Sequence, residues 1–303
     1  MKTKKVRLAI FAHYDKNKLI QDYVIYYLKE LKKIVDNIIF VSDCNVKSNE
    51  VKKILPYITH SIIGKHGEYD FGSYKRGVLY AQQNKLLDDC DELIFCNDSC
   101  YGPLYTFKNV FDTMAQKECD FWGLTYNPVG ITKDTCDTLY EDNSPHVQSF
   151  FLVFRPQVFN SEIFSNFINN IKKENDKFLI IIKYEIGLSK LLRKNGFREC
   201  VYCQTTLSHK HSERFHYLKL MLHDKNPLIK TSVIRQKKYI NKLLKLINKY
   251  TDYDSKLISK DLKYNSYYKR LGILDRIFSI FSDEDKSHVI IFFLGIKLSI
   301  SKK

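Results

Sequence analysis

The stretch Asp91–Pro103, DELIFCNDSCYGP, decides the fold class. Its first part, 92–96, is apolar enough for a buried strand, and the polar triplet NDS follows without a spacer before Gly-Pro breaks the chain. In open α/β sheets, ligands bind outside the carboxyl ends of parallel strands. We therefore expect Asp98 at a ligand-binding edge. The alternative is an ordinary turn, because Asn, Asp and Ser favour turns at strand ends.

Strand-like and helix-like segments alternate on both sides of this stretch. The predicted strands are 6–12, 37–42, 58–63, 120–125, 146–154 and 199–206, and the predicted helices are 18–35, 46–55, 73–87, 104–116, 159–173 and 184–197. Strand, helix, strand at this spacing indicates βαβ units. The expected fold class is α/β, with a mostly parallel sheet flanked by helices.

Composition limits the function classes without choosing one. The chain has 303 residues, of which 44% are hydrophobic, so it can bury a sizeable core and is not expected to be disordered. A formal net charge of +15 favours an anionic partner, such as a nucleotide diphosphate, an anionic membrane surface or nucleic acid.

Cysteine usage and the first residues predict a cytosolic protein. Only Cys200 and Cys203 form a C-x-x-C, with no second pair at zinc-site spacing, so the eight cysteines are expected to be reduced core thiols. The start, MKTKKVRLAIF, has too short an apolar part for a signal peptide and predicts a first strand, after which Asp15 could cap the next helix. No run approaches the roughly 18 apolar residues of a membrane span.

A second polar cluster lies in 68–77, EYDFGSYKRG. Gly72 would permit a tight turn and Ser73 would cap the following helix, which places Asp70 and Lys75 in its first turns. A helix N-terminus with cations nearby suits a phosphate or ribose. A capped helix with solvated charges explains the same residues equally well.

Further candidates lie at the ends of later elements. His146 and Gln148 follow a long polar loop and start a strand, which places them near a pocket mouth. Glu185 opens a leucine-striped helix, where the helix dipole favours its ionised form; this suits either a cap or a general base. His209 and His211 follow the last predicted strand, and one of them could ligate a cation; a polar, tail-like segment explains both residues equally well.

The composition changes at about residue 231. A basic amphipathic helix is predicted over 233–250, followed by a polar segment over 251–265, expected to be loosely ordered, and by short apolar runs. We expect two parts: a domain over 1–230, and a basic, mainly helical appendage over 231–303. The apolar runs of the appendage are too short to span a bilayer, but the appendage could lie on the surface of one. The alternative is packing on the core.

Several motifs in order resemble the rhamnan synthesis protein F family of bacterial glycosyltransferases. They are YDFGSYKRG (69–77), NDSCYGP (97–103), DFWGLT (120–125), HVQSFFLVF (146–154) and NPLIK (226–230). The resemblance runs from about residue 8 to residue 235. It implies transfer of rhamnose or a related deoxyhexose from dTDP-rhamnose or a similar donor to a glycan or lipid-linked glycan. Such an enzyme would build a cell-surface polysaccharide, as in lipopolysaccharide or capsule, from the cytoplasm or the inner face of the membrane.

A wider resemblance is to nucleotide-sugar glycosyltransferases of the two-layer α/β type, GT-A. Their metal motif is usually Asp-x-Asp, and here Asn97 and Ser99 flank Asp98. Their late motif has an acidic pair before a leucine-rich helix, and here Tyr184 replaces one acid beside Glu185. The resemblance implies a GT-A-like fold, a divalent cation (Mg²⁺ or Mn²⁺) at Asp98, and Glu185 as the base.

The chemistry of sugar transfer assigns the roles. Negative charge grows on the leaving phosphate and must be stabilised, and the acceptor hydroxyl must lose a proton. The expected catalytic residues are Asp98 and Glu185. The remaining candidates are His13, Asp70, Lys75, Asn97 and Ser99 for the donor, His146 and Gln148 for the sugar or acceptor, and Asp98 and His209 for a metal.

Two rival functions remain. A basic nucleic-acid-binding protein fits the charge, but no recognised binding motif stands out, so nucleic acid is not the expected partner. An inactive sugar-binding relative would keep the fold and lose the chemistry.

Overall fold

The computed structural model describes residues 5–131, 140–203, 220–235, 240–264, 278–282, 288–293 and 296–301. The chain divides into two compact units, Met1–Tyr253 and Asp254–Lys303. Among the described helices, none has the length and apolar character needed to cross a membrane.

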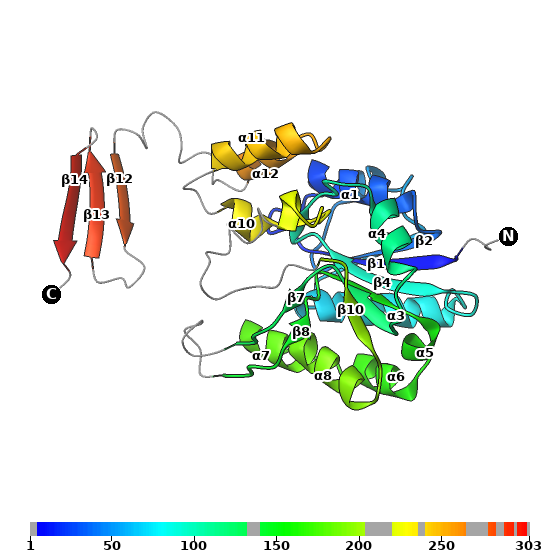
Figure 1. The fold of residues 1–303 in the computed structure, drawn as a ribbon. Coiled ribbons are helices and arrows are strands. Elements are labelled where there is room, and N and C mark those ends of the chain that lie inside the picture. The colour runs from blue at the N-terminus through cyan, green and yellow to red at the C-terminus, as the bar shows by residue number, and fades with distance from the viewer. Residues whose placement is uncertain are drawn as a thin grey trace. The chain divides into compact units, whose positions relative to one another are not determined.

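The described part of the first unit is built on a seven-stranded sheet in the order β10-β6-β9-β4-β1-β2-β3 (Figure 1). Its strands are β1 (Arg7–His13), β2 (Asn37–Ser42), β3 (His60–Ile63), β4 (Glu92–Asn97), β6 (Phe121–Gly123), β9 (Phe151–Phe154) and β10 (Glu199–Val201). Strands β3, β2, β1 and β4 are parallel, and β9 runs antiparallel between β4 and β6. The predicted mostly parallel α/β sheet is confirmed.

Helices cover both faces of this sheet (Figure 1). They are α1 (Asp22–Lys32), α2 (Ser48–Lys52), α3 (Tyr69–Gln83), α4 (Phe107–Met114), α5 (Pro156–Phe159), α6 (Glu162–Asn169), α7 (Lys177–Ile180), a π-helical stretch η1 (Ile181–Ile186) and α8 (Gly187–Lys194). Because strand side chains alternate between faces, Phe11 packs on Tyr27 of α1, with ring centroids 5.2 Å apart. On the other face Tyr74 of α3 stacks on Phe95 at 4.4 Å.

Helix α3 lies close to the sheet because of a glycine in the YDFGSYKRG motif. A Cβ on Gly77 would stand 2.3 Å from Cγ2 of Ile10 in β1, so any larger residue would push the helix away from the strand. Gly72 lies inside the helix, where a Cβ would stand 2.2 Å from Cβ of Glu68. The glycines of this motif thus serve close packing, and the predicted tight turn at Gly72 is wrong.

Two predicted helix caps are also wrong. Helix α3 begins at Tyr69, so Ser73 lies within it, and the Ser73 hydroxyl is 3.0 Å from Nε2 of His66. Asp15 does not cap α1, whose N-cap is Gln21; instead its carboxylate accepts hydrogen bonds from Asn17 N and Gln21 Nε2.

The predicted strand over 146–154 is two strands. The first, β8 (His146–Val147), pairs with β7 (Tyr126–Asn127), and the second is β9 of the main sheet. Between them the Ser149 amide donates to Oε1 of Glu185 at 2.9 Å, so it has left the strand ladder.

The later part of the first unit returns to the NDS triplet. Strand β11 (Ile229–Lys230) pairs antiparallel with β5 (Cys100–Tyr101), and α10 (Thr231–Arg235) and α11 (Ile240–Tyr250) follow. The division after Tyr253 lies beyond the boundary expected after residue 230. The seven described cysteines form no disulfide, as expected for reduced thiols.

The second unit contains one helix and a small sheet. Helix α12 (Lys256–Tyr264) occupies a segment expected to be loosely ordered. The strands β12 (Phe278–Ser282), β13 (His288–Phe293) and β14 (Ile296–Ser301) form an antiparallel sheet where only short apolar runs were expected. The helical expectation therefore holds for α10 and α11, and α12 and the terminal strands are additions to it.

Candidate functional site

The candidate site lies at the carboxyl ends of β1, β2 and β4. Strand β1 has β2 on one side and β4 on the other, so the strand order reverses here, which is where open α/β sheets bind ligands. Asp98 follows β4 directly, and its Oδ2 accepts a hydrogen bond from Tyr14 N, just after β1, at 2.9 Å. The Tyr23 hydroxyl of α1 donates to Asp98 O at 2.9 Å. Asp98 is thus held at the reversal point from two elements.

Asn97 connects the two polar clusters that the sequence singled out. Its Nδ2 donates to Oδ2 of Asp70 at 2.7 Å, and its Oδ1 accepts from Ser99 N at 3.1 Å and from the Ser99 hydroxyl at 2.5 Å. Asn97 is buried, so the amide is a fixed bridge. The structure therefore brings Asp70 together with the triplet Asn97, Asp98 and Ser99, although Asp70 lies far from the triplet in the sequence.

The backbone before Asp70 is in an uncommon conformation. Tyr69 has φ 56°, in the left-handed region that bulky residues rarely adopt, and its side chain is half exposed. Such conformations cost free energy and gather at functional sites. Here the strained residue starts α3 and precedes the carboxylate that Asn97 holds.

The acids of this edge have perturbed pKa values. Burial raises the pKa of the Asp98 carboxyl well above its usual range, and the negative charges of Asp70 and Asp15 raise it further. Burial also raises the pKa of Asp70 to about 6, with a further contribution from the charge of Glu185. The charge of Asp70 thus acts on Asp98, and that of Glu185 acts on Asp70, so a cation bound beside Asp70 would relieve the repulsion.

Glu185 sits differently from the expectation. The helical segment runs without a break from α7 through η1 to α8, so Glu185 lies inside it and not at a helix N-terminus. The argument from the helix dipole is therefore wrong. Its Oε1 accepts from Ser149 N at 2.9 Å, which orients the carboxylate. The π-helical geometry around it is rare and is frequent at functional sites.

His13 supports the edge from below. Its Nδ1 is 2.9 Å from the Ser42 hydroxyl, its Nε2 is 3.2 Å from Leu19 O, and Nε2 lies 3.8 Å from Oδ2 of Asp98. Burial lowers the pKa of His13 to about 4, so the ring is neutral at pH 7. It fills and orders the floor beneath Asp98 without adding charge, and its predicted donor contact stays a prediction.

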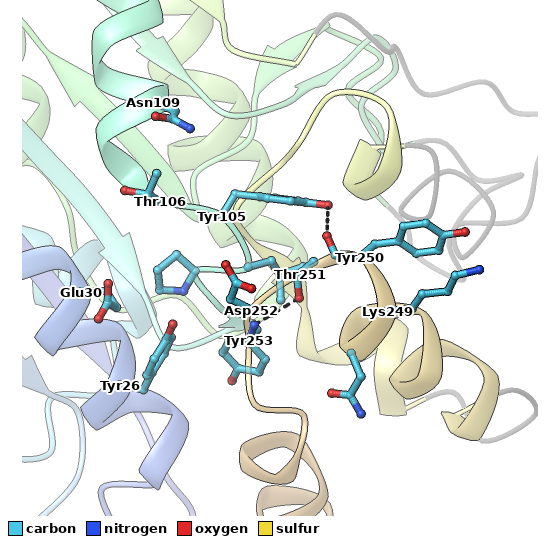
Figure 2. Close-up of a pocket in the computed structure, with 13 residues that line it drawn as sticks. Tyr26, Glu30, Tyr105, Thr106, Asn109, Lys249, Tyr250, Thr251, Asp252 and Tyr253 are labelled. Carbon is cyan, nitrogen blue, oxygen red and sulfur yellow. Dashed lines mark hydrogen bonds between the residues drawn. The ribbon is translucent and has the colours of Figure 1, made fainter.

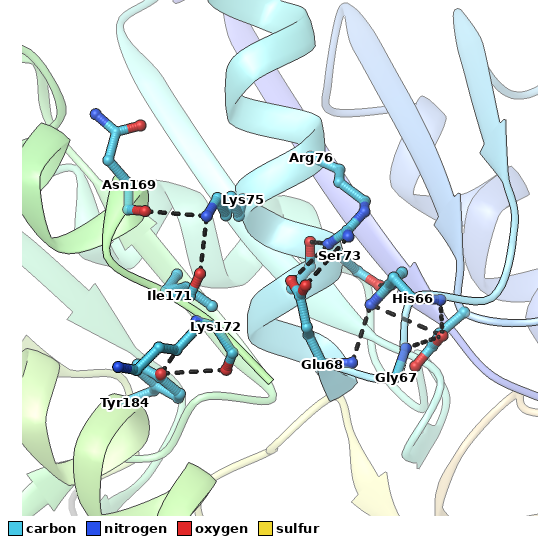
Figure 3. Close-up of polar contacts among 12 residues, drawn as sticks. His66, Gly67, Glu68, Ser73, Lys75, Arg76, Asn169, Ile171, Lys172 and Tyr184 are labelled. Carbon is cyan, nitrogen blue, oxygen red and sulfur yellow. Dashed lines mark hydrogen bonds and ion pairs between the residues drawn. The ribbon is translucent and has the colours of Figure 1, made fainter. Parts of the chain in front are cut away.

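The other predicted contacts are spread more widely. Lys75 donates to Asn169 O at 2.9 Å and Ile171 O at 2.8 Å, which ties α3 to the chain after α6 (Figure 3). His146 and Gln148 are buried, and Gln148 Oε1 accepts from the Thr125 hydroxyl at 2.7 Å. Their ligand roles stay predictions, and His209 lies outside the described residues.

Two cations that the sequence analysis missed act on the site. The positive charge of Arg235 lowers the pKa of Asp98, and that of Lys177 lowers the pKa of Asp70. Arg235 is brought near because β11 pairs with β5 and Thr231 N donates to Ser99 O at 2.8 Å. The NPLIK motif just before α10 was the available signal, but nothing in its spacing points to the NDS triplet.

The oxygen ligands at this edge suit a hard cation held partly by substrate. In the part of the chain that the structure describes, no group of three or more His, Cys, Asp or Glu side chains is arranged to hold a metal ion. Asp98 and Asp70 offer carboxylates, and Ser99 a neutral oxygen. Mg²⁺ commonly takes one or two carboxylates and completes its shell with phosphates and water. These residues fit such a cation.

The comparison with protein families decides where this chain belongs. A family model described as Rhamnan synthesis protein F matches residues 38–294, which include the NDS triplet, Glu185 and Arg235. The chain belongs to the rhamnan synthesis protein F family. The resemblance stated from the motifs is confirmed.

Two individual relatives and one solved structure are also similar to this chain, at lower coverage or identity. The chain is 27% identical over 199 residues to "Virulence protein VirA" of Vibrio anguillarum, covering 64% of this chain and 58% of that protein. It is 26% identical over 160 residues to "Uncharacterized protein y4gN" of Sinorhizobium fredii, covering 53% and 39%. The chain thus spans less than two thirds of these relatives. A crystal structure of 4-diphosphocytidyl-2C-methyl-D-erythritol synthase is similar with a TM-score of 0.41 and 12% identity, covering 73% of this chain and 100% of that one.

Proposed function

We propose that this member of the rhamnan synthesis protein F family is a glycosyltransferase. It moves rhamnose or a related deoxyhexose from a nucleotide diphosphate to a growing cell-surface polysaccharide. The observation that carries the proposal is the Asn97 bridge, which fixes Asp70 beside Asp98 where the strand order reverses. Family membership over most of the chain supports the same reaction class.

The donor's diphosphate would lie against this edge. Asp98, with Asp70 and Ser99, would hold a divalent cation, and the cation would supply positive charge to the leaving phosphate. Arg235 and Lys177, whose charges already act on Asp98 and Asp70, would stabilise the same group. Positive charge placed where negative charge develops is the main source of rate in such transfers.

Glu185 is proposed as the base. The bond from the anomeric carbon to the phosphate oxygen breaks, a bond from the acceptor oxygen to that carbon forms, and the hydroxyl proton passes to Glu185. The Ser149 amide holds Oε1, which fixes the direction of the other carboxylate oxygen. A positioned carboxylate of this kind contributes roughly 10²–10⁴-fold in rate.

The proposed location is the cytoplasmic face of the membrane. A net charge of +15 attracts anionic lipid, near which a lipid-linked acceptor would be found. The intact protein should therefore sediment with anionic vesicles and be released by salt, and should not sediment with neutral vesicles. Equal binding to both vesicle types would count against this location.

A donor screen tests the function. We expect nucleotide release from dTDP-rhamnose, with UDP-glucose and GDP-mannose as comparison donors, and we expect an acceptor polysaccharide to stimulate it. EDTA should lower the rate if the cation is required. Donor binding without release would indicate an inactive sugar-binding relative. Tight DNA binding with a steep salt dependence, and no release, would favour the nucleic-acid alternative.

A further inference from the structure

A cavity lies in the first unit, away from the sheet-edge contacts described above. Its volume is about 560 Å³, within the roughly 300–1,000 Å³ of small-molecule sites. Three segments wall it: α1, the chain from Pro103 into α4, and the end of α11 with the residues after it (Figure 2). We call it the tyrosine pocket and define it by Tyr26, Glu30, Tyr105, Tyr250, Asp252 and Tyr253.

The pocket is fixed by contacts between these segments. The Tyr105 hydroxyl donates to Tyr250 O at 3.3 Å, and the rings of Tyr26 and Tyr253 meet edge to face with centroids 5.2 Å apart (Figure 2). Thr251 N donates to Ile247 O at 2.9 Å and ends α11. The walls therefore come from distant parts of the sequence but form one framework.

The lining combines aromatic rings with side chains that bind hydroxyl groups. Its four tyrosines offer flat apolar surfaces, and carboxylates, amides and two threonine hydroxyls lie among them. Both acids of the lining act on Tyr26, since the charges of Glu30 and Asp252 raise its pKa in addition to burial. A sugar ring has apolar C–H faces and hydroxyls that both donate and accept, so it matches each of these groups.

The charges of the pocket suit a neutral ligand. Glu30 and Asp252 line it together with Lys249, whose ammonium lies 5.0 Å from the Tyr250 ring centroid. Beside it, Lys33 pairs with Glu30 at 2.7 Å and Lys225 lies over the Tyr105 ring at 5.3 Å. Positive and negative charges are mixed, so nothing here resembles a cationic cradle for a diphosphate.

Helix α1 connects the tyrosine pocket to the candidate site. Tyr23 of this helix donates to the Asp98 carbonyl, and Tyr26 and Glu30 lie about 4.5 and 10 Å farther along its axis. A second wall, the chain from Pro103, follows the NDS triplet after the two residues of β5 and Gly102. A polymer whose end reacts near Asp98 would have its preceding units at this distance.

We propose that the tyrosine pocket binds a neutral saccharide unit of the acceptor glycan. This inference rests on the proposed function, since it names the site at which that reaction's acceptor is held. The pocket would keep the growing chain on the enzyme while its end reaches the sheet edge.

The test measures saccharide binding without a donor. Neutral disaccharides of rhamnose, glucose and N-acetylglucosamine are titrated into the full chain and followed by saturation-transfer NMR. We expect at least one to bind, and Tyr250→Ala and Asp252→Asn each to weaken it by about 10-fold, because each removes one contact. Tyr250 is 45% exposed, and its carbonyl, which Tyr105 needs, remains in the variant.

Tyr264→Ala is the matched control, an exposed tyrosine of the second unit that should leave disaccharide binding unchanged. dTDP should not displace the disaccharide. Binding of no disaccharide, equal binding by the pocket variants, or displacement by dTDP would each overturn the inference. Disaccharide binding through the pocket, with no donor turned over, would instead reject the proposed function and leave the pocket standing.

Discussion

The sheet edge and the tyrosine pocket both border α1, but they use opposite chemistry. At the edge, burial raises the pKa values of Asp98 and Asp70, and cations from distant elements act on them. In the pocket, Glu30 is already paired with Lys33, and four tyrosines line the walls. The edge therefore favours a ligand with strong charge, and the pocket favours one with none. One helix can thus serve both halves of a transfer between a charged donor and a neutral acceptor.

The variant with the largest expected effect is Asp98→Ala, at the sheet edge. We expect it to abolish transfer while the protein still folds, because Asp98 lies at the end of β4 and outside the core clusters. Turnover by nucleotide release and the thermal midpoint are measured on the same preparation. Asp112→Ala, which removes an exposed partner of Lys108, is the control and should leave turnover unchanged. Wild-type turnover by the Asp98 variant would reject the edge as the active site.

The second change is Glu185→Gln. The variant keeps an oxygen to accept from Ser149 N but cannot take a proton, so turnover should fall by roughly 10²–10⁴-fold. Glu174→Gln is the control, since Glu174 pairs with Lys183 of η1 but belongs to no proposed site. It should lower the thermal midpoint and not the turnover. If Glu185→Gln does the same, Glu185 is structural and the base must be sought elsewhere.

The third change separates charge from structure at Asp70. Its folded pKa is raised, so the folded protein binds this proton more tightly than the unfolded chain, and stability falls as pH rises from 3.8 to about 6. Moving the pKa over that range corresponds to about 3 kcal/mol of unfolding free energy. Asp70→Asn should therefore be up to about 3 kcal/mol more stable than wild type at pH 8 and equal to it below pH 4.

Denaturant unfolding of the Asp70 variant at both pH values checks this, with Asp89→Asn, an exposed acid, as the control. The gain in stability should accompany a loss of turnover, because a carboxylate at the edge is lost. A variant that is less stable at pH 8 would show that the hydrogen bond from Asn97 outweighs the cost of the buried charge.

Much of the sheet was predictable because its strands carry a strong apolar pattern. Strand β2 has the predicted bounds, and β1 and β4 differ by a residue. Since parallel strands bring their carboxyl ends to one edge, Asn97, Asp98 and Ser99 could be placed there as well. The contact between Asp70 and Asn97 could also be expected, because it requires only that the helix carrying Asp70 starts at that edge.

What the sequence could not predict depends on tertiary contacts. The strand over 146–154 is interrupted because Ser149 N donates to Glu185, a residue far along the chain. The helical segment around Glu185 already begins at Lys177, well before its leucine stripe. This early start was not predictable, because the apolar run FLIII (178–182) suits a strand equally well. Arg235 approaches Asp98 only through the pairing of β11 with β5.

The smallest expected effect lies in the pocket. Tyr105→Phe keeps the ring and removes only the hydrogen bond to Tyr250 O, which is worth roughly 0.5–1.5 kcal/mol. Because the ring surface remains, the affinity for a disaccharide should fall by less than in Tyr250→Ala, roughly two- to fivefold for 0.5–1 kcal/mol. The measurement is the same titration by saturation-transfer NMR, together with the thermal midpoint of each variant.

Tyr105→Ala supplies the contrast, since it removes ring and hydroxyl together. If Tyr105→Phe weakens binding as much as Tyr105→Ala, the hydroxyl contacts the saccharide itself. If neither changes it, Tyr105 only closes the wall, and recognition falls to Tyr26, Tyr250 and the two acids.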